Sequence, residues 1–192
     1  HYTSREDIER IVEPVLIAPL RAEWVKVREE ALAERAKIDK VQESATPGAA
    51  GHRRKERSAA ITRGRNREAA ILHAFMERLA AIRVLDPACG SGNFLYVSLS
   101  LLKDLEKEVH NLSAELGLAE NLRVSPAQLL GLEINAYAHE LAQVVVWIGY
   151  LQWNIRNGFT AWDRPILKPL DTIREADAIL DLSDPANPRE PE

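Results

Sequence analysis

Cysteine is nearly absent from this sequence. Of its 192 residues, one is cysteine, one is methionine and 6% are aromatic. Cys89 alone cannot form a disulfide within the chain or supply a cysteine-based zinc cluster, and it fits a reducing cytoplasm. With 46% hydrophobic residues, the chain can bury one sizeable core and is long enough for one domain with an additional segment. We therefore expect a cytoplasmic protein without a disulfide framework.

Positive charge and long apolar runs are also lacking. The formal net charge is −4 and the pI is about 5.8. No global positive field therefore indicates a nucleic-acid partner, and such binding would have to come from a local patch or a missing piece. The longest uncharged runs, 87–102 and 141–155, are shorter than the ~20 apolar residues of a membrane-spanning helix. No basic-then-apolar leader is visible, so the sequence predicts a soluble protein with no membrane partner.

Helical patterns dominate the first 82 residues. Ser4 has the character of a helix cap, and Pro14 should kink or end the helix that follows it. A second, charge-rich helix is expected from about 22 to 43. The apolar face of a third helix comprises Ile71, Ala74, Phe75, Leu79 and Ile82. We interpret residues 1–82 as an N-terminal helical segment.

Basic residues cluster in and after an expected linker. Small residues together with Pro47 make 44–57 the predicted flexible, basic linker. The segment 52–67 contains a single acid, Glu56, and seven basic residues: Arg53, Arg54, Lys55, Arg57, Arg63, Arg65 and Arg67. Clustered Lys and Arg displace counterions from a nucleic-acid backbone, so Arg53, Arg54, Lys55 and Arg57 are candidate phosphate contacts. The alternative interpretation is a solvated loop and helix entry.

From residue 83 the pattern alternates between strands and helices. Strands are predicted at 83–86, 128–134 and 170–174, with helices over 93–116 and 136–154 between them. Strand, helix, strand, helix, strand is typical of a parallel sheet with right-handed crossovers. We therefore predict an α/β fold for this part of the chain.

The stretch VLDPACGSGNFL follows the first predicted strand directly. Gly90 and Gly92 have no Cβ, so the backbone can approach a ligand closely beyond the carboxyl ends of the strands, where doubly wound sheets bind ligands. Asp86 ends the first strand and offers a carboxylate to an ammonium group or ordered water. Glu133 ends the second strand, where it can accept hydrogen bonds from the vicinal hydroxyls of a ribose, with Ile134 beside it to pack on a purine. These groups suit a nucleoside that carries a positively charged amino-acid tail.

Two other glycine-rich motifs do not fit this turn. A P-loop needs Lys and then Ser or Thr after its second glycine, and this sequence has Asn93 and Phe94 there. The dinucleotide pattern G-x-G-x-x-G needs a third small residue at the position of Leu95. The complete stretch DPACGSGNF is more specific than its glycines, because a generic tight turn does not need Asp, Pro, Asn and Phe at fixed places.

At these residues the sequence resembles the S-adenosylmethionine-dependent DNA adenine N6-methyltransferases. More narrowly, it is similar to the methyltransferase part of type II restriction-modification proteins that fuse methylation and cleavage. The similar segments are HYTS (1–4), DPACGSGNFL (86–95), GLEINAYAHELAQ (131–143) and, more loosely, IREADAIL (173–180), in the order of the gamma group. The resemblance implies a Rossmann-like class I methyltransferase fold, here with an incomplete parallel sheet and an N-terminal helical extension. It also implies S-adenosyl-L-methionine as the cofactor.

The resemblance further implies the cofactor-binding residues. Tyr2 and Thr3 would border the methionine end, and Glu133 would bind the ribose hydroxyls. Ile134 would pack on the adenine, whose amino group would donate to Asp177. The full expected set is Tyr2, Thr3, Asp86, Pro87, Ala88, Gly90, Gly92, Asn93, Phe94, Glu133, Ile134 and Asp177. The implied partner is double-stranded DNA, bound by a longer protein.

One element of the family has no counterpart in the sequence. The family uses an Asn-Pro-Pro-Tyr or Asn-Pro-Pro-Phe tetrapeptide to bind the target amino group and to stack on the extruded base. Asn187 and Pro188 are followed by Arg189, so we interpret them as an accidental pair. No catalytic residue and no metal ligand is therefore assigned. We expect a fragment in which 83–192 forms the N-terminal half of the methyltransferase domain, and which binds cofactor weakly or not at all and does not methylate.

Two other functions remain open at this point. A methyltransferase of the same fold that acts on RNA or on a protein would share the donor loop. A non-catalytic module could instead contact DNA or another subunit through residues 53–67. Cys89 is expected to pack in the structure rather than to act as a nucleophile, and His73 and His139 lack metal-ligand spacing.

Overall fold

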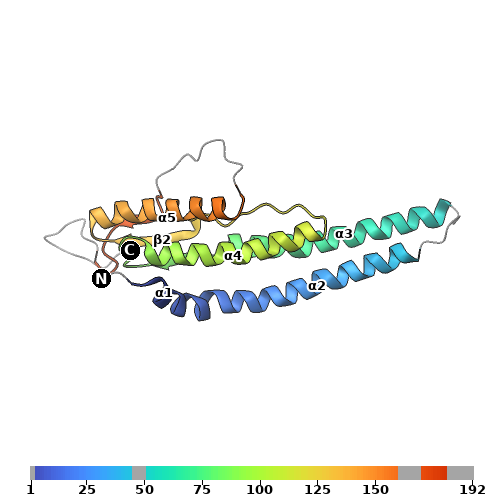
Figure 1. The fold of residues 1–192 in the computed structure, drawn as a ribbon, viewed down its shortest axis with the longest axis horizontal. Helices are drawn as coiled ribbons and strands as arrows, with labels where there is room; N and C mark the ends of the chain where they lie inside the picture. The colour runs from blue at the N-terminus through green and yellow to red at the C-terminus, as the bar shows by residue number, and fades with distance from the viewer. Residues whose placement is uncertain (1–2, 45–50, 160–169, 181–192) are drawn as a thin grey trace. The chain divides into compact units, whose positions relative to one another are not determined.

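The computed structural model describes residues 3–44, 51–159 and 170–180. Contacts divide the chain into two compact units, the first comprising 1–17, 80–104 and 124–192 and the second 18–79 and 105–123. The units alternate along the sequence, and Figure 1 traces their elements by label. The division predicted from the sequence, into segments 1–82 and 83–192, is a different one and stays a prediction.

A parallel sheet lies in the first unit. Within the described residues it has three strands in the order β1 (Val84–Asp86), β2 (Leu129–Glu133) and β3 (Ile173–Glu175). Both strand pairs are parallel, as the sequence predicted, with Asp86 opposite Gly131 and Glu133 opposite Glu175. The third strand begins later than the expected residue 170. Leu170 instead opens a turn, in which its carbonyl accepts a hydrogen bond from the Ile173 N–H at 2.9 Å.

Two helices follow β1 and β2 at the predicted places. Helix α4 spans Asn93–Glu115 and helix α5 spans Ala136–Arg156. The side chain of Asn135 starts α5 by accepting a hydrogen bond from the Ala138 N–H at 3.0 Å, and α5 contacts β2 and β3. A Cβ on Gly149 of α5 would lie 2.1 Å from the ring of Tyr96 in α4. The two helices therefore approach closely only because residue 149 has no side chain.

The N-terminal helix of the first unit, α1, spans Arg5–Val12. Ser4 caps it as predicted, since its side chain accepts a hydrogen bond from the Asp7 N–H at 3.2 Å. As predicted, the regular α-helix does not continue through Pro14: α1 ends at Val12, and Pro14 lies in a π-helical turn, η1 (Glu13–Ile17).

The second unit contains two long helices, α2 (Ala18–Glu43) and α3 (Gly51–Ala80), and the segment Leu105–Arg123. The expected linker is wrong over 51–57, because these residues already belong to α3. Arg, Lys and Glu are good helix formers, and they outweigh the loop signal of the small residues before them. Among the described residues of both units, no helix combines the length and apolar composition needed to cross a bilayer.

Helices α2 and α3 pack side by side in antiparallel register (Figure 1). The register is visible where Ile38 of α2 contacts Gly64 of α3, at which a Cβ would lie only 2.6 Å from the Ile38 side chain. The buried face of α3 comprises Gly64, Glu68, Leu72, Phe75, Met76 and Leu79. The face predicted from the sequence was therefore partly wrong, since Ile71 is half-buried and Ala74 is exposed.

A buried ion pair joins α2 to α3. The guanidinium of Arg35 donates two hydrogen bonds to the fully buried carboxylate of Glu68, at 2.8 and 2.9 Å, and a further one to the carbonyl of Leu116. The hydrogen bond to Glu68 and the nearby negative charge raise the pKa of Arg35 above its ordinary value. A carboxylate buried at this place without such a cation would be strongly disfavoured.

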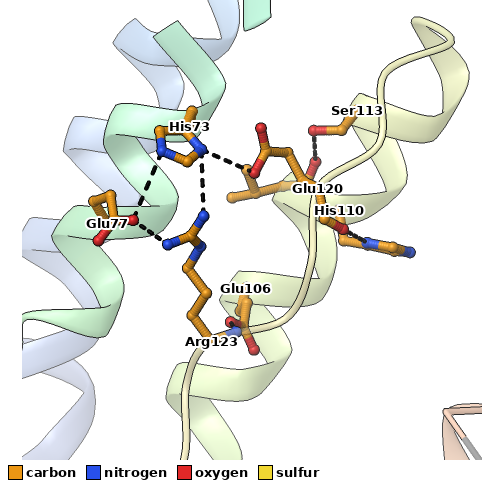
Figure 2. Close-up of polar contacts among 8 residues, drawn as sticks. His73, Glu77, Glu106, His110, Ser113, Glu120 and Arg123 are labelled. Carbon is orange, nitrogen blue, oxygen red and sulfur yellow. Dashed lines mark hydrogen bonds and ion pairs between the residues drawn. The ribbon is translucent and has the colours of Figure 1, made fainter. Parts of the chain in front are cut away.

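A second polar cluster in this unit joins α3 to the segment that follows α4 (Figure 2). His73 lies 3.7 Å from Glu77 and 3.3 Å from Glu120. The Arg123 side chain pairs with Glu77, and its backbone N–H donates to Glu106. His73 therefore contacts carboxylates of two neighbouring segments of the protein itself.

Replacing Arg35 with alanine should leave the Glu68 carboxylate buried without its cation. We expect the free energy of unfolding to fall by about 3–5 kcal/mol, measured by urea denaturation followed by circular dichroism. The exposed Arg28 supplies the control, whose change to alanine should cost less than about 1 kcal/mol. Changing Arg35→Met and Glu68→Leu together should recover most of the loss, because no charge is then buried. Equal effects of the Arg35 and Arg28 changes would contradict the buried pair.

Candidate functional site

Three carboxylates lie at the carboxyl ends of the parallel strands. Asp86 is the last residue of β1, Glu133 is the last residue of β2, and Asp177 follows the end of β3 by two residues. Because the strands are parallel, these ends share one edge of the sheet, where α/β folds bind their ligands. The edge is the one at which the sequence predicted a site.

The turn after β1 depends on its two glycines. Gly90 and Gly92 have φ angles of +53° and +80°, in the left-handed region that residues with a side chain rarely adopt. At Gly92 a Cβ would also lie 3.0 Å from the backbone of Ala142 in α5. At Gly90 a Cβ would meet no atom within 4 Å. The first glycine thus faces open space, and the second lets α5 pack against the turn.

Glu133 fixes the position of this turn. One carboxylate oxygen of Glu133 accepts a hydrogen bond from the Gly90 N–H and the other accepts one from the Asn135 N–H, both at 2.8 Å. Cys89 adds a backbone contact, since its N–H donates to the carbonyl of Leu132 at 2.9 Å. The end of β2 therefore holds the turn after β1 in place through both backbone and side chain.

The other two acids order their own turns. Asp86 accepts a hydrogen bond from the Ala88 N–H at 3.1 Å. Asp177 accepts one from the Ile179 N–H at 2.8 Å and one from the Leu180 N–H at 3.1 Å. All three carboxylates thus face backbone N–H groups at the sheet edge, and such bonds to a charged acceptor are stronger than those between neutral groups.

A cavity of about 300 Å³ opens beside the turn after β1. Its lining comprises Thr3, Ile8, Ile11, Asp86, Ala88, Cys89, Gly90, Ser91, Asn93 and Phe94. The side-chain amide of Asn93 donates to the carbonyl of Thr3 at 2.8 Å, which ties the N-terminal segment to the start of α4. The cavity therefore has one wall from the turn and a second from the segment before and within α1. Its size lies at the lower end for a small-molecule site.

Of the twelve residues predicted to bind a cofactor, only some line this cavity. Thr3, Asp86, Ala88, Gly90, Asn93 and Phe94 line it. Glu133 supports its Gly90 wall, and Gly92 is buried against α5. Pro87 and Ile134 are exposed, Asp177 is half-buried at the β3 end, and Tyr2 lies outside the described residues.

Four residues of the cavity lining were not predicted as site residues: Ile8, Ile11, Cys89 and Ser91. The sequence marked the two isoleucines only as apolar positions of a helix. Ile11 is 57% exposed, which is unusual for the inward face of an amphipathic helix. Helical spacing can identify an apolar face, but it does not say which segment that face meets.

Cys89 lines the cavity as a buried thiol. Burial raises its pKa to about 11, and the negative charges of Asp86 and Glu133 add to the effect. Only the thiolate is nucleophilic, so Cys89 acts as a packing residue, as the sequence suggested. Over the described ranges, no group of three or more His, Cys, Asp or Glu side chains is arranged to hold a metal ion.

An α/β unit with a parallel sheet and a glycine turn after its first strand belongs to the class of folds that bind ligands beyond the carboxyl ends of their strands. Within that class the family is defined by sequence. Residues 59–179 match the MmeI DNA-methyltransferase domain, and the chain belongs to this family.

Two relatives agree with this family. DNA methyltransferase A of Bacillus subtilis (strain 168) is 38% identical over 116 residues, which cover 56% of this chain and 13% of that protein. A putative type II restriction enzyme and methyltransferase of Methanocaldococcus jannaschii is 36% identical over 84 residues, which cover 43% of this chain and 7% of that protein. The chain thus spans a small part of the relatives that it matches. The predicted resemblance to a restriction-modification methyltransferase region is confirmed.

A solved structure has the same fold. The type IIL restriction-modification enzyme MmeI, determined in complex with DNA, aligns with a TM-score of 0.62 and 24% identity. The alignment covers 93% of this chain and 20% of the MmeI chain. Together with the parallel sheet, this confirms the predicted Rossmann-like methyltransferase fold with its large helical content.

The state of Cys89 leads to a chemical prediction. With a pKa of about 11, roughly one thiol in a thousand is ionised at pH 8. Alkylation of the folded chain by iodoacetamide, followed by mass spectrometry, should be at least about 100-fold slower than alkylation of the same chain in urea. Raising the pH from 8 to 10 should accelerate it. A native rate similar to the unfolded rate at pH 8 would contradict the buried, neutral thiol.

Proposed function

We propose that this chain is the cofactor-binding portion of a DNA adenine N6-methyltransferase within a restriction-modification protein. The observation that supports the proposal most directly is the Glu133 carboxylate, which joins the glycine turn to the end of β2 beside an open cavity. Membership of the MmeI methyltransferase family supports the reaction class. Segment 83–192 is the proposed N-terminal half of the methyltransferase domain, and 1–82 its helical extension.

The residues present fit S-adenosyl-L-methionine. Gly90 leaves open space beside the turn, where ligand atoms can approach the backbone. Each oxygen of Glu133 accepts one backbone hydrogen bond and keeps a second lone pair for a ribose hydroxyl. Ile134 is 58% exposed beside it, so its side chain is available to the flat face of a purine. Asp177 lies at the end of the next strand, in keeping with the proposed contact to the adenine amino group.

The rest of the cavity is assigned to the amino-acid end of the cofactor. Asp86 lines the cavity and can pair with an ammonium group. Thr3, together with Tyr2, is proposed to border the same end. Pro87, Ala88, Gly92, Asn93 and Phe94 complete the proposed binding segment. S-adenosylmethionine supplies an electrophilic methyl group on a sulfonium centre.

The proposed task of these residues is to bind and orient rather than to react. They hold the donor in one place and exclude water from it, which accelerates a transfer by proximity and desolvation. The protonated Cys89 offers no competing nucleophile in the same cavity. An adenine in a duplex must first be flipped out, at a cost of a few kcal/mol. The Asn-Pro-Pro-Tyr or Phe tetrapeptide for that base is not in this sequence, so methylation by this chain alone is not expected.

Double-stranded DNA is the proposed partner of the longer protein, with phosphate contacts from Arg53, Arg54, Lys55 and Arg57. MmeI, the structural neighbour, was determined with DNA. A cytoplasmic location remains part of the proposal and rests on the single cysteine.

Cofactor binding tests the proposed function directly. The chain should bind S-adenosylmethionine weakly in a calorimetric titration, and Glu133→Ala should reduce the affinity at least about tenfold, because charged hydrogen bonds to two hydroxyls are lost. Glu175 is a matched control, since this exposed glutamate lies opposite Glu133 in the neighbouring strand. Glu175→Ala should bind like the unchanged chain.

Two results would overturn this assignment. One is equal affinity for the Glu133→Ala and Glu175→Ala variants. The other is no heat of binding and no thermal stabilisation at saturating cofactor. Circular dichroism of each variant separates a local loss of binding from unfolding.

A further inference from the structure

The second unit carries a cationic groove that cofactor binding does not use. It lies where the end of α2 and the beginning of α3 pack together, and it has a volume of about 620 Å³. Its lining comprises Val41, Ser44, Arg53, Arg54, Glu56, Arg57, Ala60 and Arg63, which we call the basic groove. We propose that the basic groove binds the sugar-phosphate backbone of double-stranded DNA, independently of base sequence.

The cations in and next to the basic groove form no ion pairs. Within the described part of the chain this holds for the four lining arginines, Arg53, Arg54, Arg57 and Arg63, and for their neighbours Lys55 and Arg65. The single acid, Glu56, lies 3.1 Å from His52. Because the protein does not compensate these charges locally, they are available to an external anion.

Five other arginines of the same unit form ion pairs with acids of that unit. Arg35 pairs with Glu68, Arg67 with Glu34, Arg21 with Glu108, Arg78 with Glu23 and Arg123 with Glu77. Hydrogen bonds from Lys37 and Arg67 lower the pKa of Glu34, so the acid of that pair stays charged. Ion pairs thus occur along the helical hairpin, whereas the described arginines that line the basic groove form none.

The position of the cations in α3 is unfavourable for the helix itself. The N-terminus of a helix carries a partial positive charge, which favours acids and disfavours Lys and Arg. The first turn of α3 contains no acid, and Arg53, Arg54 and Lys55 follow directly after Gly51 and His52. A sequence that breaks a local rule at exposed positions indicates a binding function there. A bound anion would satisfy both the side chains and the helix end.

The length of the charged stretch favours a polyanion over a small anion. Arg53 and Arg63 are ten residues apart in α3, which corresponds to about 15 Å along the helix axis. At one phosphate per 3.4 Å of axis on each strand, this length matches roughly four phosphates. A free phosphate ion could contact only part of the groove. Guanidinium groups also bind phosphate oxygens in a bidentate manner.

The composition of the groove favours a duplex over a single strand. Proteins that bind single-stranded nucleic acid stack its bases on aromatic side chains. None of the eight lining residues is aromatic, and only Val41 and Ala60 are apolar. A lining of this kind contacts the backbone and reads no bases. The choice of DNA rather than RNA rests on the proposed function.

Fluorescence anisotropy with a labelled random-sequence DNA duplex tests the proposal. The chain should bind at about 50 mM salt and lose affinity steeply towards 200 mM, because phosphate contacts release counterions. Arg53→Gln, Arg54→Gln and Arg57→Gln together should weaken binding at least tenfold at the lower salt. The slope of log affinity against log salt should shrink by about 0.9 for each lost contact.

A control with the same change in net charge isolates the basic groove. Arg28, Arg156 and Arg174 are exposed arginines outside it, and changing these three to glutamine should alter affinity less than about threefold. Unlabelled single-stranded DNA and double-stranded RNA of equal length serve as competitors. Both should compete less well than the unlabelled duplex.

Several outcomes would overturn the proposal. They are no duplex binding by the unchanged chain, equal losses for the two triple variants, and stronger competition by single-stranded DNA, by RNA or by polyglutamate than by the duplex. The basic-groove variant should titrate S-adenosylmethionine like the unchanged chain. Failure of DNA binding with intact cofactor binding would therefore reject the basic groove alone, and the reverse result would reject the proposed function of the sheet edge.

Discussion

One carboxylate, that of Glu133, connects the two turns on which the candidate site depends. It accepts the Gly90 N–H of the turn after β1 and the Asn135 N–H that precedes α5. A carboxylate between two N–H donors resists displacement, because each bond to the charged group is stronger than one between neutral partners. The glycine turn is thereby held in its left-handed conformation before any ligand arrives. A site organised in advance loses less conformational entropy on binding.

The sequence alone was sufficient to predict the structural elements that depend on local patterns of residues. Parallel strands at Val84 and Leu129, the glycine turn and the acids at the strand ends follow from apolar runs, glycine and charge. The predictions from the sequence were wrong at two places. Gly51 begins helix α3 instead of lying in a linker, and Leu170 lies in a turn before β3. At Gly51 the helix-forming residues that follow outweighed the loop signal.

Contacts between distant residues could not be predicted in the same way. Asn93 donates to the carbonyl of Thr3, ninety positions earlier, and this bond brings the N-terminal segment to the cavity. Ile11 was recognisable as apolar, but its place in the cavity wall depends on how α1 packs on the turn. Periodicity reports which side of a helix is apolar, whereas the partner of that side is decided by the folded chain.

The register of α2 against α3 has a consequence for how this hairpin can vary. Ile38 against Gly64 and Arg35 with Glu68 set the register of the hairpin. Seven extra residues in each helix beyond these contacts would keep the same faces together and lengthen the two helices by about 10 Å. The length of the hairpin can thus change in steps of about two helical turns while the contacts that set its register stay constant.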